Sequence, residues 1–174
     1  MQTVDSRILV VVRHARAADH EGSDHDRPLT AAGHSAAHEA GLWLRTRGVE
    51  ASYALVSSAR RTVQTWQGLA QGAGWALEPS VAPTLYSAGV DAAIDLVNEI
   101  DDEVDVAVLV GHNPTVAMLA ALLPDGTGDP SAEQAVAIGG FPPGSIAVFR
   151  IQGDWWDVRE GAATLIAHRL GDDE

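Results

Sequence analysis

The sequence predicts an α/β fold, namely a three-layer α/β/α sandwich with a mostly parallel central sheet. Three apolar runs, residues 8–12, 53–57 and 104–110, are short and rich in valine or other aliphatic residues. Such runs are typical of strands that are buried on both faces in parallel sheets. A segment with helical features follows each run along the chain, and this alternation indicates an α/β protein.

The helical segments carry recognisable start and stop signals. Thr30 is a suitable N-cap for a helix over residues 31–47, and Gly48 is a suitable end. A second helix begins near residue 60 and ends in the glycine-rich stretch 71–74. Further helices are expected over 88–100 and 115–123, the last with Asn113 as its N-cap and Pro114 at its first position. The remaining expected elements are a short strand and turn in 75–86, a loop over 123–133, strands near 136–138, 145–151 and 164–169, and a turn or hairpin connection over 153–161.

Length and composition indicate one soluble domain. The chain has 174 residues, a formal charge of −13 and no cysteine, so disulfides and thiolate chemistry are excluded. An acidic chain is not expected to bind nucleic acid or a membrane surface in general, and any cationic pocket must be local. Without a signal-peptide pattern or a run of about 20 apolar residues, a cytoplasmic location is expected. We expect residues 1–174 to form a single domain, with 171–174 as a disordered acidic tail.

Cationic and imidazole side chains follow three of the predicted strands. Arg13 and His14 come directly after the first, Arg61 follows the second in the first turn of a helix, and His112 follows the third. Ligands of open α/β sheets bind beyond the carboxyl ends of the strands. A cation at the positive end of a helix dipole is unfavourable unless an anion shares the spot. If the strands are parallel neighbours, these four side chains meet in a phosphate site.

Simpler explanations apply to each of these features. Arg13 could pair with a surface acid while His14 caps the strand, and Arg60 is expected to point into solvent. The polar loop 17–27 holds histidines and acids but no metal-ligand spacing, so we expect it to border the site without a metal. His34 and His38 are four residues apart on a helix, but the glutamate of the metalloprotease motif is absent. We therefore expect them to be surface or packing residues, and we predict neither a metal nor a cofactor.

Four motifs together resemble the histidine phosphatase superfamily, which is also called phosphoglycerate mutase-like. They are Arg13-His14-Ala15, the segment from Asp24 through Arg27-Pro28-Leu29-Thr30 with Gly33, Ser57 through Arg61 with Gln64-Thr65, and Gly111-His112-Asn113-Pro114. The resemblance runs from about residue 8 to residue 123 in the family's order. The short length and the Arg-Pro-Leu-Thr segment look most like the small SixA-like phosphohistidine phosphatases.

The resemblance implies a role for each matched residue. His14 would be the nucleophile that is transiently phosphorylated, and Arg13, Arg61 and His112 would form the phosphate pocket. Arg27 is expected to bind phosphate or substrate at the edge, and Asn113 to orient the pocket. Water would then hydrolyse the phosphoenzyme without a metal. A phosphorylated protein or a small phosphorylated molecule is the expected partner.

Two positions depart from the family pattern. Ser58 stands where a proline is usual, and we expect little consequence. Residues 83–87 contain no acid where mutases and many phosphatases place a glutamate proton donor, and Asp24, His25 or Asp26 could replace it. A missing donor favours good leaving groups such as the P–N bond of phosphohistidine, because general acids help poor leaving groups most. The alternatives are a phosphatase of small phosphomonoesters, such as sugar phosphates, and a non-catalytic phosphate or phosphopeptide binding module.

Overall fold

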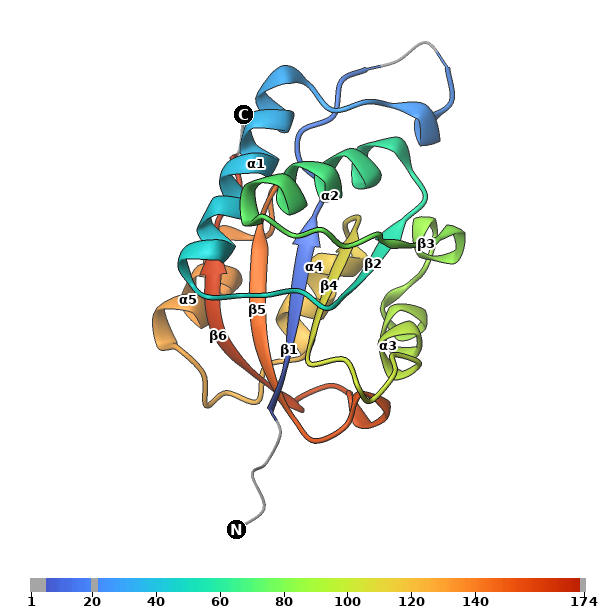
Figure 1. The fold of residues 1–174 in the computed structure, drawn as a ribbon. Helices are drawn as coiled ribbons and strands as arrows, with labels where there is room; N and C mark the ends of the chain where they lie inside the picture. The colour runs from blue at the N-terminus through green and yellow to red at the C-terminus, as the bar shows by residue number, and fades with distance from the viewer. Residues whose placement is uncertain (1–5, 20–21, 173–174) are drawn as a thin grey trace.

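A computed structural model of the chain describes residues 6–19 and 22–172 (Figure 1). Within them a six-stranded sheet has the order β3-β2-β4-β1-β5-β6. The strands are β1 (Ser6–Arg13), β2 (Tyr53–Ser57), β3 (Ser80–Ala82), β4 (Val106–Gly111), β5 (Ile146–Gln152) and β6 (Ala163–Arg169). The helices are α1 (Ala31–Thr46), α2 (Arg60–Ala73), α3 (Val90–Asn98), α4 (Thr115–Leu122) and α5 (Pro130–Gly139). Short 3-10 helices cover Asp24–Asp26, Pro83–Tyr86 and Trp155–Asp157.

The central sheet is mostly parallel, as predicted. β1 pairs in parallel with β4, β4 with β2, and β2 with β3, whereas β5 pairs antiparallel with both β1 and β6. β1, β4 and β2 are therefore adjacent, and their carboxyl ends lie at one edge of the sheet. The hairpin connection predicted over 153–161 joins β5 to β6.

Helices cover both faces of the sheet, which gives the predicted three layers. Val10 and Val12 of β1 face α1 and α2, in a core cluster that includes Leu44 and Leu69. Leu9 and Val11 face the opposite way, into a second cluster with residues of α3 and α4. This alternation is the period of two expected of a strand, and because both faces are covered the run reads as continuously apolar. In Figure 1, α1 and α2 lie in front of the strands and α4 lies behind them.

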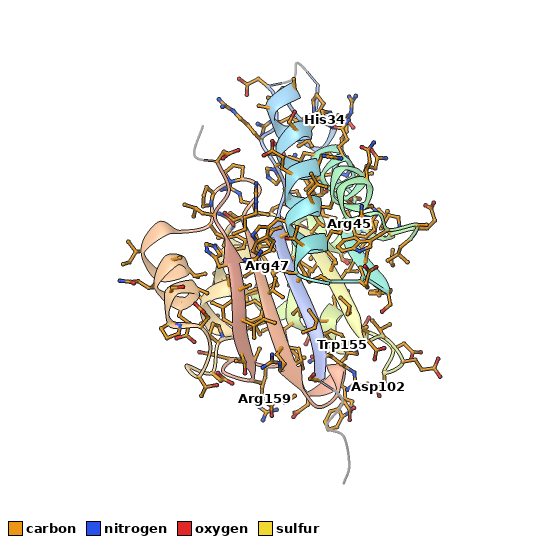
Figure 2. All side chains as sticks on the ribbon, turned by 60° about the vertical axis from the view of Figure 1, so that its left-hand side comes forward. His34, Arg45, Arg47, Asp102, Trp155 and Arg159 are labelled. Carbon is orange, nitrogen blue, oxygen red and sulfur yellow. The ribbon has the colours of Figure 1, made fainter. Side chains whose placement is uncertain are left out.

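The end of the sheet away from the strands' carboxyl ends is closed by aromatic and polar contacts. Trp155 is fully buried, and its indole N–H donates to the carbonyl of Val104 at 2.7 Å. Figure 2 shows Trp155 near Asp102 at this end of the molecule, whereas His34 lies at the opposite end. Buried indole groups need such a partner, so this bond secures the loop that leads into β4.

One predicted strand is wrong. Residues 136–138 belong to α5, whose N-cap Asp129 accepts a hydrogen bond from the backbone N–H of Ala132, with Pro130 at the first turn. This start signal lies in the segment that the sequence analysis assigns to a loop over 123–133. The apolar residues of such a short run do not distinguish a strand from a helix, whereas the Asp-Pro start does.

The disordered tail predicted over residues 171–174 starts too early in the chain. Gly171 is buried, and its backbone N–H donates to Ser145 Oγ at 2.9 Å, so the chain is fixed at this residue. Asp173 and Glu174 lie outside the described residues. None of the helices within residues 6–19 and 22–172 is both long enough and apolar enough to cross a membrane.

The close packing of α1 against α2 gives a prediction about stability. A Cβ atom at Gly72 would overlap the carbonyl oxygen of His38. We expect Gly72→Ala to lower the free energy of unfolding by about 1–3 kcal/mol, the usual cost of overpacking, as measured by urea denaturation. Gly89→Ala is the control, because no atom outside its chain neighbours lies within 4 Å of its Cβ position. There we expect a smaller loss, which comes only from the preference of the N-cap of α3 for glycine over alanine. Equal stability of the two variants would contradict this packing.

Candidate active site

The carboxyl ends of β1 and β4 are joined beyond the last residues of the strands. The backbone N–H of His14 donates to the carbonyl of Gly111 at 3.1 Å, which extends the parallel pairing by one residue. The His14 ring therefore lies beside that of His112, with ring centroids 5.3 Å apart. The next residue, Ala15, is buried, and its N–H donates to Thr65 Oγ1 of α2 at 2.9 Å. His14 is thus held by β4 on one side and α2 on the other.

The tautomer of His14 follows from its hydrogen bond. Its Nδ1 lies 2.7 Å from the carbonyl oxygen of Ala15. A carbonyl only accepts, so Nδ1 carries the proton and the lone pair of the neutral ring is on Nε2. Burial is the main cause that lowers the pKa of His14 to about 3, and His112, Arg61 and Arg13 lower it further. Near neutral pH the ring is a neutral imidazole with a free nucleophilic nitrogen.

His112 is held by the carboxyl end of β2. Its Nε2 forms a 2.7 Å hydrogen bond with Ser57 Oγ, and Ser57 is completely buried at the end of β2. Burial, followed by Arg61, lowers the pKa of His112 to about 4. The other ring nitrogen, Nδ1, is buried and has no hydrogen-bond partner among the described residues. Its hydrogen-bonding capacity is therefore unused among these residues.

Two guanidiniums flank the histidines. Arg13 Nη1 donates to the carbonyl of Phe141 at 3.0 Å, and Arg61, whose exposed fraction is 6%, donates through Nη1 to the carbonyl of Asp24 at 2.8 Å. Burial lowers the pKa of Arg13, but a guanidinium remains charged near neutral pH. Nε of each arginine is buried without a partner in the described part of the chain. Both cations thus keep N–H groups available to an anion.

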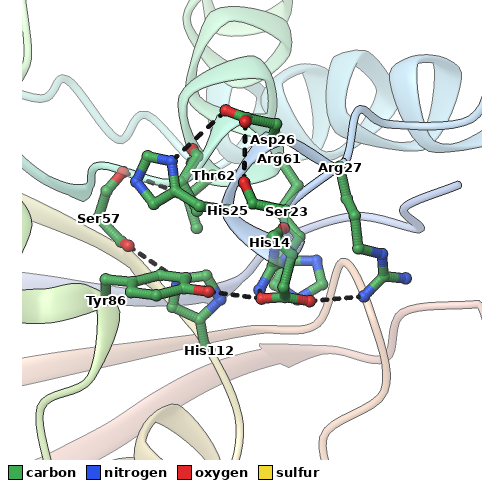
Figure 3. A network of polar contacts seen from close by, with 12 residues as sticks. His14, Ser23, His25, Asp26, Arg27, Ser57, Arg61, Thr62, Tyr86 and His112 are labelled. Atoms are coloured by element: carbon green, nitrogen blue, oxygen red, sulfur yellow. Dashed lines mark hydrogen bonds and ion pairs between the residues drawn. The ribbon is translucent and has the colours of Figure 1, made fainter. Parts of the chain in front are cut away.

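The structure brings Arg13, His14, Arg61 and His112 together from three strand ends, as predicted. Figure 3 shows His14, Arg61 and His112 of this group. Arg60 is exposed, also as predicted. Arg27 lies farther out: its Nη1 donates to Asp24 Oδ1 at 3.2 Å and its Nε to the carbonyl of Ala18 at 3.2 Å. Arg27 is connected to Arg61 through Asp24, whose carboxylate accepts hydrogen bonds from both arginines.

The predicted capping role of Asn113 is wrong. Pro114 occupies the N-cap position of α4, and the Asn113–Pro114 peptide is cis. The amide of Asn113 donates to the carbonyl of Phe141 at 2.9 Å instead of accepting a bond from the helix. The same carbonyl accepts from Arg13, so Asn113 and Arg13 share one anchor.

Sequence reasoning missed three residues that shape the site. Phe141 supplies the shared carbonyl, Ser57 holds His112, and the Tyr86 hydroxyl donates to Asp24 Oδ2 at 2.6 Å. Figure 3 shows Tyr86 beside His112, and their rings are perpendicular with centroids 5.5 Å apart. Ser57 carried a signal, since it ends a predicted strand directly before the arginine pair. A backbone carbonyl such as that of Phe141 leaves no such signal.

Metal-binding groups of three or more His, Asp or Glu side chains are not found among residues 6–19 and 22–172. His34 is exposed and His38 is half-buried on α1. In the polar loop 17–27, His20 and Glu21 lie outside the described residues. The positive charge of the described pocket comes from its arginines.

Comparisons with known proteins agree with this geometry. Residues 9–87 match the model of the histidine phosphatase superfamily (branch 1). An uncharacterised protein from Mycobacterium tuberculosis (strain H37Rv) is 37% identical over 160 residues, which cover 91% of this chain and 99% of the relative. A Mycobacterium leprae relative, also uncharacterised, is 32% identical over 165 residues, with the same coverage.

Two solved structures are similar over nearly the whole chain. One is described as "Putative Phosphohistidine Phosphatase SixA from Nakamurella multipartitia"; it has a TM-score of 0.83 and 31% identity, and the match covers 95% of this chain and 96% of that one. The other is the protein histidine phosphatase SixA complexed with tungstate, with a TM-score of 0.74, 25% identity, and coverage of 94% and 96%. With its four motifs on the matching fold, the chain belongs to the histidine phosphatase superfamily, branch 1.

Proposed function

We propose that this chain is a phosphohydrolase that works through a phosphohistidine intermediate on His14. The carrying observation is the bond from Nδ1 to the carbonyl of Ala15, which leaves the lone pair on Nε2 of a neutral ring between two arginines. In the first step Nε2 attacks phosphorus and the bond to the leaving group breaks. In the second, water attacks the phosphorylated His14 and releases phosphate.

The roles of the pocket residues follow from charge. Arg13 and Arg61 hold the phosphoryl oxygens and stabilise the negative charge of the transition state. His112, with Nδ1 unpartnered among the described residues, provides a further hydrogen bond to a phosphoryl oxygen when that nitrogen is protonated. Because two fixed guanidiniums supply the positive charge, the proposed steps require no metal ion.

We further propose phosphohistidine, in a protein or as a small phosphoramidate, as the substrate. The similarity to structures described as phosphohistidine phosphatases supports this, as does the absence of an acid in residues 83–87. A protonated imidazole leaves readily and depends little on a proton donor in the site. A non-catalytic binding module is the weaker alternative, because a binding site has no need of a neutral, tautomer-fixed imidazole.

The first prediction concerns His14. Incubation with a radioactive phosphodonor should label the protein with acid-labile, base-stable phosphate, and His14→Ala should abolish both label and turnover, because the nucleophile is lost. His34→Ala, an exposed histidine on α1, is the matched control and should retain both. Unchanged activity in His14→Ala would refute the mechanism, and tight phosphate binding without turnover of any activated phosphoester would favour the binding module.

The second prediction separates the two adjacent arginines. Arg61→Lys should lower kcat/KM by about 10²–10³-fold, since a point charge cannot replace the fork of N–H groups that holds a tetrahedral anion. Arg60→Lys, one residue earlier and exposed, should behave as the wild type. A comparable loss in both variants would indicate a general disturbance of the start of α2 and would contradict a specific role for the Arg61 guanidinium.

The third prediction concerns pH. Since the pKa of His14 is lowered to about 3 and that of His112 to about 4, both rings stay neutral as pH falls from 7 to 5. After correction for protonation of the substrate, kcat/KM should change little over this range and should fall only below about pH 4. Initial rates with 4-nitrophenyl phosphate measure this. A loss centred near pH 6.5 would show that an essential histidine titrates at its ordinary value.

A further inference from the structure

Asp24 places a half-exposed carboxylate against the buried Arg61 guanidinium. It begins the 3-10 helix Asp24–Asp26 in the segment between β1 and α1. Its Oδ2 accepts hydrogen bonds from the Tyr86 hydroxyl at 2.6 Å and from Arg61 Nη2 at 3.1 Å, and its Oδ1 accepts from Arg27 Nη1 at 3.2 Å. The carboxylate therefore rests on one guanidinium of the pocket and one at its edge.

Arg61 can hold Asp24 and a phosphoryl group together. A guanidinium has five N–H groups, of which Arg61 uses one on each Nη for the carbonyl and the carboxylate of Asp24. Its Nε is buried and has no partner within the described residues. A phosphate bound by the remaining N–H groups would lie beside the carboxylate, because both anions share the same planar cation.

A phosphate bound to Arg61 would raise the pKa of the Asp24 carboxyl. In the free site the Tyr86 hydroxyl, together with Arg27 and Arg61, holds the pKa of the Asp24 carboxyl well below its usual range, so the group is ionised. A phosphoryl dianion on Arg61 neutralises part of that support and adds a like charge nearby, and both effects raise the pKa of the carboxyl. Substrate binding therefore favours proton uptake by Asp24.

His25 and Asp26, the other two residues that could replace the missing proton donor, form a separate set of contacts. Asp26 accepts a hydrogen bond from Ser23 Oγ at 2.8 Å and lies 3.8 Å from His25 Nδ1. His25 Nε2 forms a 2.9 Å hydrogen bond with Ser58 Oγ. Figure 3 shows Asp26 turned toward both His25 and Ser23. Tyr86, which holds Asp24, belongs to residues 83–87, a segment without an acid of its own.

We infer that Asp24 is the proton donor to the leaving oxygen when this site cleaves a phosphomonoester. The inference rests on the proposed function and extends it to substrates with poor leaving groups. As His14 Nε2 forms its bond to phosphorus, the P–O bond breaks and the proton of the Asp24 carboxyl passes to the departing oxygen. The carboxylate then takes a proton from the water that attacks the phosphohistidine, the P–N bond breaks, and phosphate leaves.

The test is a series of aryl phosphates with the wild type, Asp24→Asn and Asp26→Asn. The series runs from 2,4-dinitrophenyl phosphate, with a good leaving group, to phenyl phosphate, whose phenol has a pKa of about 10. The measured quantity is kcat/KM, which reports transfer to His14 and is independent of the later hydrolysis step. Inhibition by inorganic phosphate is measured in parallel to show that the pocket remains assembled.

We expect Asp24→Asn to lower kcat/KM for phenyl phosphate by about 10²-fold or more and to leave dinitrophenyl phosphate nearly unaffected. Asp26→Asn, the same charge change in the same turn, should keep the wild-type dependence. Phosphate should inhibit Asp24→Asn at least as strongly as the wild type, since a competing negative charge is gone.

Two results would overturn the inference. One is an equal loss for all leaving groups in Asp24→Asn, or weakened phosphate inhibition, which would make the residue a structural support of Arg61. The other is a leaving-group dependence that appears in Asp26→Asn instead. A wild-type protein that neither turns over any member of the series nor forms phosphohistidine on His14 refutes the proposed function itself. That result is distinct from a failure at Asp24.

Discussion

The parallel pairing of β1 with β4 and of β4 with β2 is the contact on which the site depends. Continuation of the first pairing, from the N–H of His14 to the carbonyl of Gly111, sets the two histidine rings side by side. The position of β2 next to β4 brings Ser57 to His112 and starts α2 at the same edge. A one-residue shift in register would turn every side chain of a strand to the opposite face of the sheet. The packing of Val10 in one core cluster and of Leu9 in the other therefore helps to fix this pairing.

The site holds a concentrated positive charge in a chain whose formal charge is −13. Two features keep that charge local. Arg13 is anchored on a backbone carbonyl, and the pocket arginine Arg61 is paired with Asp24. Burial is also the main cause that keeps His14 and His112 neutral. In the proposed mechanism, a neutral His14 beside permanent cations suits an anionic substrate. The cations attract the phosphate group, while His14 keeps the lone pair that would attack phosphorus.

The Asp24 carboxylate gives the segment between β1 and α1 a direct link to the pocket. It connects Arg61 of α2, Arg27 and Tyr86, which come from three separate parts of the chain. Charge-assisted hydrogen bonds, such as those from the two arginines, are stronger than neutral ones. Solvent weakens them here, because the Asp24 carboxylate is partly exposed. The pKa of Asp24 therefore depends on what is bound to Arg61. The inferred proton transfer from Asp24 rests on this dependence.

The sequence by itself determined the sheet and the central residues of the site. The valine-rich runs and the N-cap at Thr30 are local patterns, and Arg13, His14, Arg61 and His112 each follow directly from a strand end, so that knowing the strands locates the residues. The apolar residues of 136–138 failed as a guide because such a short run fits a strand or a helix. The family resemblance added the roles of these residues, which no local pattern contains.

Only the tertiary structure decided the partners that set protonation and position. The carbonyl of Phe141, which anchors both Arg13 and Asn113, is a backbone group without a residue-type signal. The contact between Asp24 and Tyr86 joins residues 62 positions apart, and Asn113 turned away from the helix it was expected to cap. Such contacts depend on how distant segments pack, and the free energies involved are summed over many residues that a local pattern does not include.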